Sequence, residues 1–447
     1  MLPAPARGIG RGARPSGPVI FNRLWLLVLL AAVDLGVWRH LPLLIVGGLL
    51  GLGIGGAQLL WGRFCLSGVE YERHLGASHA LWGEEVQFSV RIANRKLLPL
   101  TWLLAEDRMP GRLLIDRAPL VRDRFSPLVH LKSLLPLLPY EQVTRRYTVH
   151  CHQRGLFEFG PGRLESGDLL GYLRRVTRYD KVDRLLIYPK VLDLDVPAAA
   201  SMRLIGPRVV DRVILTDPSR TVGVRPYQPG DPLHHVEWRA TARAQSMLVR
   251  VFEPTTDPAV AIFLNSDVPR AEYDYYDPPE LEFCISLAAS LAKWLLGKRH
   301  PIGLFGNGEP AGPGAVRLPV NGGPEQLQRV LETLALASPF GPVRTLRVDW
   351  WQGTDLPAYK AVTMRPPMSQ LLLKESARLP YEISILLITA DWDADLLAAV
   401  REVRRRRPVT VLFVQTANSA AEPEGADAIR VPYTEGWQAL ERLQLAA

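Results

Sequence analysis

Two apolar stretches near the N-terminus carry the strongest hydrophobic pattern in the chain. Residues 24–37 are apolar except for Asp34, and residues 41–61 contain no charged side chain. At 1.5 Å per residue the second stretch is about 31 Å long, which is enough to cross the apolar core of a bilayer. Arginines precede the pair and follow it, which favours a cytoplasmic location for both ends. The pattern predicts a transmembrane helical hairpin over 21–62, and hence a multi-pass protein of the cell membrane with both termini cytoplasmic.

The residues around this hairpin refine the prediction. Residues 1–20 are rich in Pro, Gly and Arg and contain no acid, which is typical of a disordered basic tail. A signal peptide is the alternative for 24–37, but the second apolar stretch follows without a small-residue cleavage site between the two. In the second stretch Gly47, Gly51 and Gly55 share one helical face, where Ala31 and Ala32 could pack.

Short segments that alternate apolar and polar residues follow the hairpin. Residues 86–92 and 146–151 alternate with a period of two, and glycine-rich turns separate such segments. We therefore predict an antiparallel β-sandwich domain over 63–195. An apolar, proline-containing insertion covers 127–139, and one interpretation is a loop near the membrane surface. His150 and His152 would share a strand face, but with no third ligand nearby we interpret them as structural.

Continuous apolar runs replace the alternating pattern in the C-terminal part. Residues 259–264, 383–388 and 409–414 have the composition of parallel strands buried on both faces, and helical patterns separate them. This order predicts a doubly wound α/β domain over 256–447. The helix expected over 393–407 ends in four arginines, which we interpret as a helix C-terminus rather than a binding patch.

Between the two domains, residues 196–255 hold an unusual concentration of charged and turn-forming residues. Asp231 and Pro232 predict the N-cap and first residue of a short helix, with Leu233, Val236 and Ala240 on its apolar face. Residues 247–252 predict a strand. The charged side chains could form an active site or a phosphate clamp, but we expect a buried network that holds this segment against the α/β domain.

The motifs of this segment resemble those of the bacterial domain of unknown function 58 family. They are Arg225-x-Tyr227-x-x-Gly230-Asp231, the run VEWRATAR at 236–243, the run LVR at 248–250, and Glu253. Two departures are Glu237, where Asp is common, and residues 233–235, where an Arg pair is common. Looser similarity lies in 154–157 and 166–171. As binding residues the resemblance implies Arg225, Tyr227, Gly230, Asp231, Trp238, Arg239, Arg243 and Arg250.

The same resemblance implies a fold and partners. It identifies the α/β domain as similar to von Willebrand factor A type domains. It also implies that the protein works beside a MoxR-type AAA+ ATPase and a transglutaminase-like membrane protein. Type A domains that bind a metal use an Asp-x-Ser-x-Ser pattern, whereas the matching positions here are Asn265, Asp267 and Pro269. Asp391 alone fits its expected place. We therefore expect no cofactor, with Mg²⁺ at Asn265, Asp267 and Asp391 as the alternative.

Charge and composition narrow the function further. The net charge of +8 is spread along the chain without a basic stripe interleaved with aromatic residues, so we expect no nucleic-acid partner. The three cysteines are far apart, and neither a phosphate-binding loop nor a nucleophile elbow occurs. We predict a membrane-anchored, cytosol-facing, non-enzymatic adaptor that helps to assemble or remodel a membrane-associated complex. The alternative is a metal-dependent hydrolase that uses carboxylates at the C-terminal edge of the α/β sheet.

Overall fold

A computed structural model divides the chain into two compact units, Met1–Tyr188 and Pro189–Ala447. It describes residues 19–122, 129–168, 174–205, 216–229, 231, 233–254, 258–266, 279–310, 316–338, 366–415 and 428–445. Most of the tail expected over 1–20 lies outside these ranges, as do Gly230, Pro232 and Asp267. The boundary between the units falls before the one expected at 195.

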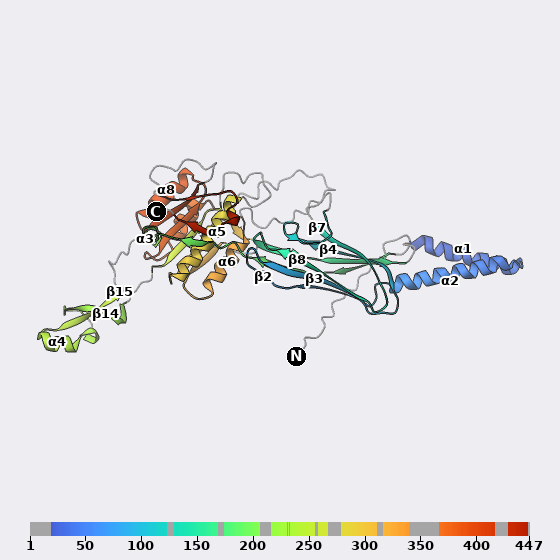
Figure 1. The fold of residues 1–447 in the computed structure, drawn as a ribbon, viewed down its shortest axis with the longest axis horizontal. Helices are drawn as coiled ribbons and strands as arrows, with labels where there is room; N and C mark the ends of the chain where they lie inside the picture. Colours follow the sequence, from blue (N-terminus) through green and yellow to red (C-terminus); the bar gives the residue numbers. More distant parts are fainter. Residues whose placement is uncertain are drawn as a thin grey trace. The chain divides into compact units, whose positions relative to one another are not determined.

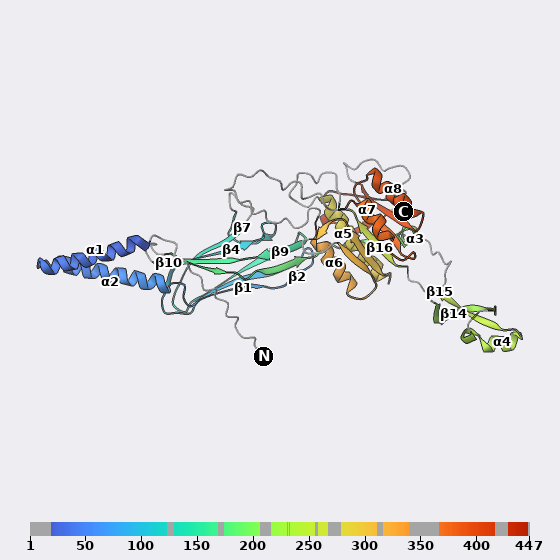
Figure 2. The same cartoon turned by 180° about the vertical axis from the view of Figure 1, so that it is seen from behind.

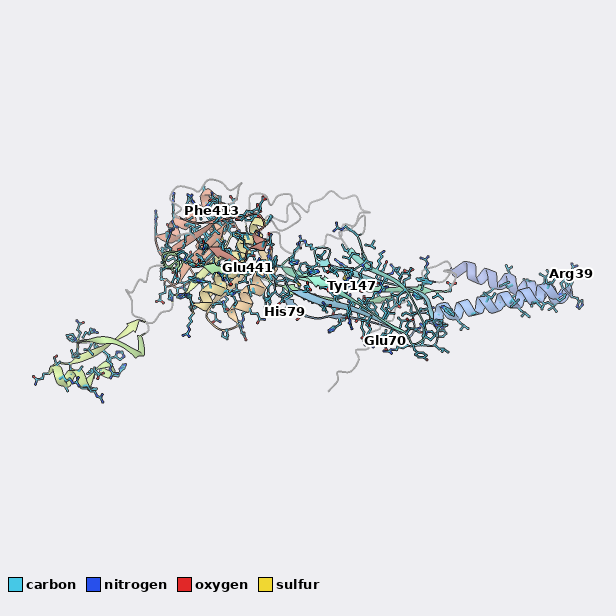
Figure 3. The ribbon with its side chains drawn as sticks, viewed as in Figure 1. Arg39, Glu70, His79, Tyr147, Phe413 and Glu441 are labelled. Atoms are coloured by element: carbon cyan, nitrogen blue, oxygen red, sulfur yellow. The ribbon has the colours of Figure 1, made fainter. Side chains whose placement is uncertain are left out.

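The first unit begins with two helices that lie side by side (Figure 1). They are α1 (Val19–Trp38) and α2 (Pro42–Phe64), joined by a turn that contains His40 at a φ of 53°. Arg39, labelled in Figure 3, lies at this turn with its guanidinium 5.0 Å from the centre of the Trp38 ring. Among the described residues only α2 is both long and apolar enough to cross a membrane, whereas the apolar part of α1 is the shorter Leu26–Trp38. The structure thus shows a helical hairpin with one candidate span, and the second span stays a prediction.

Glycines let the two helices approach closely, but not all of those that the sequence indicated. A Cβ atom built on Gly48 would lie 2.4 Å from Cγ2 of Val33, and one on Gly51 would lie 2.7 Å from Cδ2 of Leu29. Gly55 faces Leu26, while Gly47 has nothing within 4 Å. The predicted seam was therefore wrong at Gly47 and in its partners Ala31 and Ala32, because the contact face includes Gly48 and meets larger side chains.

The rest of the first unit is a β-rich domain, as predicted. A four-stranded sheet has the order β1-β3-β8-β5, and a five-stranded sheet has the order β11-β10-β4-β7-β6. Both contribute to one apolar core, to which Phe88 and Leu103 belong together with Tyr147, labelled in Figure 3. The strands of these sheets are β1 (Val69–Leu75), β3 (Glu85–Asn94), β4 (Leu100–Met109), β5 (Leu114–Ile115), β6 (Leu120–Arg122), β7 (Val129–Leu137), β8 (Gln142–His150), β10 (Gly162–Gly167) and β11 (Arg174–Tyr179). A third sheet contains β2 (His79–Ala80), β12 (Asp183–Ile187) and β9 (Gly155–Phe159).

The insertion expected over 127–139 is mostly strand β7. Its side chains alternate between buried and exposed from Val129 to Leu137, since the strand pairs with β4 on one side and β6 on the other. Among the described residues of this stretch, the turn at its end, around Leu138 and Tyr140, is a loop. His150 donates from Nε2 to a carboxylate oxygen of Asp116 over 2.9 Å and stacks on His152 at 6.0 Å between ring centres. These contacts agree with a structural role for the two histidines.

A buried charge cluster lies inside this domain and was not predicted. The Arg73 guanidinium donates to Asp107 over 3.1 Å and lies 3.4 Å from a carboxylate oxygen of Asp183. Tyr71 also donates to Asp107. Burial, reinforced by the charge of Asp183, raises the pKa of Asp107 to about 7, and burial lowers the pKa of Arg73. Both pKa shifts show that burial disfavours the charged forms, and the hydrogen bonds of Asp107 with Arg73 and Tyr71, together with the ion pair of Arg73 and Asp183, offset this cost.

Lys96 fastens the end of α2 to the β-rich domain. Its ammonium donates to the carbonyl oxygens of Phe64 and Ser67 over 2.9 and 2.8 Å, and also to that of Cys65. A helix leaves its last carbonyl groups without partners inside the helix, and a cation near that end also favours the helix dipole. Burial lowers the pKa of Lys96 to about 8, so that the side chain is still charged at neutral pH.

A six-stranded sheet forms the centre of the second unit. Its order is β19-β17-β16-β21-β22-β23, and all neighbours are parallel except β19, which runs antiparallel to β17. Every residue of β16, β17 and β21 is buried, as the continuous apolar runs predicted for β16 and β21. The strands are β16 (Val260–Leu264), β17 (Ile302–Gly306), β19 (Arg317–Asn321), β21 (Ser384–Thr389), β22 (Val409–Gln415) and β23 (Ala428–Pro432).

Helices cover both faces of this sheet (Figure 2). One pair is α5 (Pro279–Gly297) and α6 (Gln326–Leu336), and the other is α7 (Met368–Ser376) and α8 (Ala394–Arg404). Asp393 caps α8 by accepting from the amide of Leu396. Arg407, at the end of the arginine run, donates to the carbonyl oxygens of Pro380 and Leu379 over 3.1 and 3.0 Å. Arg404 to Arg407 therefore end a helix, as predicted.

The segment before the family motifs is part of this second unit. Strand β13 (Asp193–Asp195) pairs in parallel with β24 (Arg442–Gln444) near the C-terminus, and α3 (Ala198–Ile205) follows. Ser384 and Thr410 donate from their hydroxyl groups to carbonyl oxygens of α3 over 2.6 and 2.5 Å. Two short strands, β18 (Glu309–Pro310) and β20 (Ala337–Ser338), pair with each other. The α/β unit thus includes residues on both sides of the motif-bearing segment.

The contrast between Gly47 and Gly48 gives a direct test of the helical hairpin. We expect Gly48→Leu to push α1 and α2 apart, because its side chain would meet Val33, whereas Gly47→Leu has free space. A short bifunctional thiol reagent would measure the separation by joining cysteines introduced at Leu26 and Gly55. Cross-linking should fall in the Gly48 variant and persist in the Gly47 variant, and equal yields would contradict this packing.

Candidate functional site

The motif-bearing segment folds as a small unit of two strands and a helix. β14 (Thr216–Pro226) and β15 (Leu248–Pro254) are antiparallel, and Thr216 pairs with Pro254, so the segment begins and ends at one place. Between the strands lie a 3₁₀ turn, η1 (Leu233–His235), and the short helix α4 (Trp238–Ala244). We call residues 216–254 the signature hairpin. The strand predicted over 247–252 is confirmed, and the single predicted helix is instead divided into two short pieces.

Asp231 closes the turn that follows β14 instead of capping a helix. The Arg225 guanidinium donates to both of its carboxylate oxygens over 2.7 Å, and the amide of Gln228 donates to it over 2.9 Å. These hydrogen bonds hold the pKa of Asp231 down at about 2, with the bond from Arg225 as the largest cause. The predicted N-cap role was wrong, because Asp231 accepts from a residue before it in the chain and Glu237 occupies the N-cap position of α4.

A second set of contacts holds α4 on β15. The amide of Leu248 donates to the hydroxyl oxygen of Thr241 over 3.0 Å, and the amide of Glu237 donates to the carbonyl oxygen of Leu248 over 2.9 Å. Arg250 pairs with Glu237. Val236 and Val249 form a bridge and are both buried, so they are the apolar centre of the signature hairpin. Thr241 was missed from the sequence, although it stands inside the 236–243 motif.

The charges of the signature hairpin lie at its surface. Arg225 and Arg250 are half-exposed within their ion pairs, and Arg239 and Arg243 are exposed on α4. The prediction of a buried charge network was therefore wrong. Each ion pair forms between two residues of the hairpin, and its arginine stays exposed to solvent. No ion pair joins Arg239 or Arg243 to another residue in the described ranges.

An aromatic side chain lies beside these free arginines. Trp238, the first residue of α4, is 64% exposed, and Leu233 is also exposed instead of facing inward as predicted. Tyr227 is partly buried, and its amide donates to the carbonyl oxygen of Met247 over 2.9 Å. The structure thus brings Trp238, Arg239 and Arg243 together on one short helix. The other charged members of the predicted set, Arg225, Asp231 and Arg250, form ion pairs within the hairpin. Gly230, the remaining member of the predicted set, is not described.

The second candidate site is the C-terminal edge of the α/β sheet. Asn307 accepts from the amide of Ser266 over 2.7 Å and donates to the side chain of Asn265 over 3.1 Å. Asn265 donates in turn to the hydroxyl oxygen of Thr389 over 3.1 Å. All of these residues are buried, and each follows or ends a parallel strand. We call Asn265, Ser266, Asn307 and Thr389 the amide cluster.

The amide cluster lies at the sheet edge where the sequence offered Mg²⁺ binding as an alternative. Asn265 is bonded to its neighbours, and the Asp391 carboxylate accepts from the amide of Trp392 over 2.9 Å. Within the described residues no three His, Cys, Asp or Glu side chains lie close enough to hold a metal ion. The third candidate, Asp267, is outside those residues. Asn307 was missed from the sequence, and its position directly after β17 was the signal that could have identified it.

Acid should separate the ion pair of the signature hairpin only at low pH. Because the folded pKa of Asp231 lies below the unfolded value, its stabilising effect is present above the unfolded pKa and is lost as pH falls through about 2. In protein with ¹³C-labelled aspartate we expect the Asp231 carboxyl signal to titrate near pH 2. Arg225→Ala should move the midpoint up toward the ordinary value of about 3.9, and an unchanged midpoint would show that Arg225 is not the cause.

Removing Asn307 should weaken the α/β unit. Asn307→Ala takes one hydrogen-bond partner from the buried amide of Ser266 and one from Asn265. Such a loss costs about 2 kcal/mol in unfolding free energy, which denaturant titration would measure. Asn321→Ala is the matched control, because that exposed side chain bonds only locally to the amide of Gly323. Equal stability of the two variants would argue against a structural role for the amide cluster.

Comparison with known proteins agrees with the motifs. Residues 223–361 match the family described as "Protein of unknown function DUF58". A curated relative, the "Uncharacterized protein YeaD" of Bacillus subtilis (strain 168), is 22% identical over 300 residues, which are 67% of this chain and 67% of that protein.

Solved structures resemble parts of the chain only weakly. One, titled "AvmM Catalyzes Macrocyclization in Alchivemycin A Biosynthesis", has a TM-score of 0.19 and 15% identity and covers 28% of this chain and 92% of its own. The sporulation control protein Spo0M of Bacillus subtilis has a TM-score of 0.16 and 14% identity and covers 27% and 50%. At these TM-scores neither structure bears on fold or function. The family match over residues 223–361 and the relative from Bacillus subtilis thus agree with the resemblance of this chain to the DUF58 family.

Proposed function

We propose that this protein is a membrane-anchored, cytosol-facing adaptor that binds another protein through the signature hairpin. The observation that carries the proposal is the exposed trio of Trp238, Arg239 and Arg243 on α4. Tryptophan and arginine dominate the energetics of protein interfaces, so this exposed group is suited to bind another protein. Among the charged side chains that the structure describes in the hairpin, Arg225 is paired with Asp231 and Arg250 with Glu237, so the trio is the part available for recognition.

The proposed partner is a MoxR-type AAA+ ATPase, with a transglutaminase-like membrane protein in the same assembly. This part rests on the family resemblance, since members of the family tend to be encoded beside such proteins. The charge of the trio supports an acidic surface on the partner. The role would be to assemble or remodel a complex at the membrane, with no reaction carried out by this chain.

The proposed anchor consists of both helices of the N-terminal hairpin. α2 is long and apolar enough to cross a bilayer, and α1 packs along it through Gly48 and Gly51. A paired α1 would cross with α2 and leave both termini in the cytoplasm, in keeping with the arginines at either end. The proposed von Willebrand factor A-like nature of the α/β unit is supported by its strand order, in which only the edge strand β19 is antiparallel.

The metal-dependent hydrolase is the weaker alternative. It needs carboxylates that are free to bind an ion at the sheet edge. Asn265 and Thr389 instead satisfy each other within the amide cluster, and a side-chain amide is a poor substitute for a carboxylate. We therefore propose no metal, no cofactor and no catalytic residue for this site.

Loss of the Trp238 side chain should weaken binding of the ATPase without unfolding the protein. Truncation of an interface tryptophan costs about 2 kcal/mol, or roughly 30-fold in affinity. The measurement is the affinity of the full-length protein in detergent for the MoxR-type ATPase encoded in the same genome. Arg239→Glu with Arg243→Glu should weaken binding further, because it reverses the charge of the trio.

Tyr381→Ala provides the matched control, since it removes another exposed aromatic ring from the α/β unit. Binding should be unchanged in that variant. If the Trp238 variant bound as tightly as the parent, the signature hairpin would not be the contact. If the parent itself captured no ATPase, the proposed partner would be wrong.

A further inference from the structure

Exposed apolar side chains from three separate parts of the first unit gather near the end of α2. Leu97 is 75% exposed, Leu138 is 67% exposed and Tyr140 is 65% exposed, and Phe64 at the end of α2 is also exposed. Leu97 comes from the β3–β4 connection, whereas Leu138 and Tyr140 come from the β7–β8 turn. We call these four side chains the helix-end surface. Such residues are expensive to leave in water together, so this surface calls for a partner.

Hydrogen bonds fix the three parts to one another. Lys96 donates to carbonyl oxygens at the end of α2 and so places its neighbour Leu97 beside that helix. The buried amide of Asn94 donates to the carbonyl oxygens of both Leu98 and Leu138 over 3.0 Å. Its backbone amide donates to the carbonyl oxygen of Glu141 over 2.9 Å. The β3–β4 connection, the β7–β8 turn and the helix end are therefore one built surface.

The backbone of the turn shows that the position of Tyr140 is imposed. Its φ is 60°, in the left-handed region where Gly or Asn is the usual residue and a large side chain is rare. Tyr140 keeps this backbone conformation although its ring gains no burial and remains exposed to solvent. Outliers of this kind cluster at functional positions, which points to a role for the ring outside the domain itself.

The chemistry around the surface identifies the partner. The surface is continuous with α2, whose apolar length ends at Phe64, so a bilayer crossed by α2 would end at the same level. Arg63, Arg95 and Lys96 lie at this level as well. Tyrosine at the headgroup level, leucines pointing to the acyl chains and long cations that reach the phosphates are typical of a membrane interface.

We propose that the helix-end surface inserts into the cytoplasmic interface of the bilayer and gives the β-rich domain a second attachment besides α2. The proposal rests on the membrane anchoring proposed above. A protein partner is less suited to this surface, because the end of a spanning helix lies too close to the lipid headgroups to leave room for one. The β-rich domain is thereby held with this end against the membrane.

Fluorescent probes on the full-length protein would test this insertion. Single cysteines replace Leu97 or Leu138, each labelled with an environment-sensitive NBD group, and the native Cys65, Cys151 and Cys284 are buried. The protein is reconstituted into phosphatidylcholine and phosphatidylglycerol vesicles. Two quenchers are compared, a nitroxide on a lipid close to the headgroup and iodide in the water.

Two further cysteines serve as references. Leu114→Cys is the matched control, because Leu114 is 63% exposed yet pairs with His150, at the opposite end of β8 from Tyr140. Leu49→Cys reports on α2 itself. We expect the probes at 97 and 138 to be quenched by the nitroxide lipid and to be quenched by iodide several-fold less than the probe at 114.

Each other outcome overturns the proposal in a distinguishable way. Iodide quenching at 97 and 138 equal to that at 114, with the probe at 49 still quenched by lipid, would show that the domain stands away from the bilayer while the anchor holds. Iodide quenching at 49 as well would overturn the anchor and this proposal together. Shielding of 97 and 138 from both quenchers would show that protein, such as a second copy, covers the surface.

Discussion

The end of α2 imposes the constraint on which the first unit depends. An α-helix leaves its last carbonyl groups without partners, and here those groups meet a folded domain instead of water. Lys96 resolves this by donating to the carbonyl oxygens of Phe64 and Ser67. The same lysine positions Leu97, and Asn94 ties that connection to the turn at Leu138. The carbonyl groups at the end of α2 need hydrogen-bond donors, and Lys96 supplies them from the β-rich domain. This bonding joins the helix to the domain and places Leu97 and Leu138 near the helix end.

In the second unit, polar groups also need hydrogen-bond partners, and they find them in two different ways. At the sheet edge, the members of the amide cluster satisfy one another, which leaves a closed and neutral site. In the signature hairpin, Arg225 and Arg250 are paired with acids, and backbone bonds through Thr241 hold α4 in place. Trp238 and its neighbouring arginines differ from these residues, because they are exposed and take part in neither ion pair. Among the described residues, the side chains at the sheet edge are thus bonded to one another, whereas polar and aromatic groups of the signature hairpin remain exposed.

Patterns of local spacing were predicted well, whereas contacts between distant residues were not. The continuous apolar runs identified β16, β21 and β22 because strands covered on both faces need no polar positions. The alternating pattern identified β3 and β8, because a strand with one covered face needs an apolar side chain only at every second position. Periodicity did not distinguish Gly47 from Gly48, because that choice depends on how α1 is rotated against α2. Lys96 and Asn307 were overlooked because each bonds to residues that are remote in sequence. The charge network was placed in the wrong environment because charge spacing carries no information on burial.

The pairing of β13 with β24 has a consequence for the order of events during synthesis. β13 lies near the start of the second unit, and its partner β24 is synthesised after every strand of the six-stranded sheet. The unit cannot close this pair until β24 has left the ribosome, although α1, α2 and the β-rich domain are made long before. A chain truncated before β24 would therefore lack the strand that pairs with the segment leading into the signature hairpin. The sheet can thus form while this segment is still unpaired, and the arrival of β24 then fastens it.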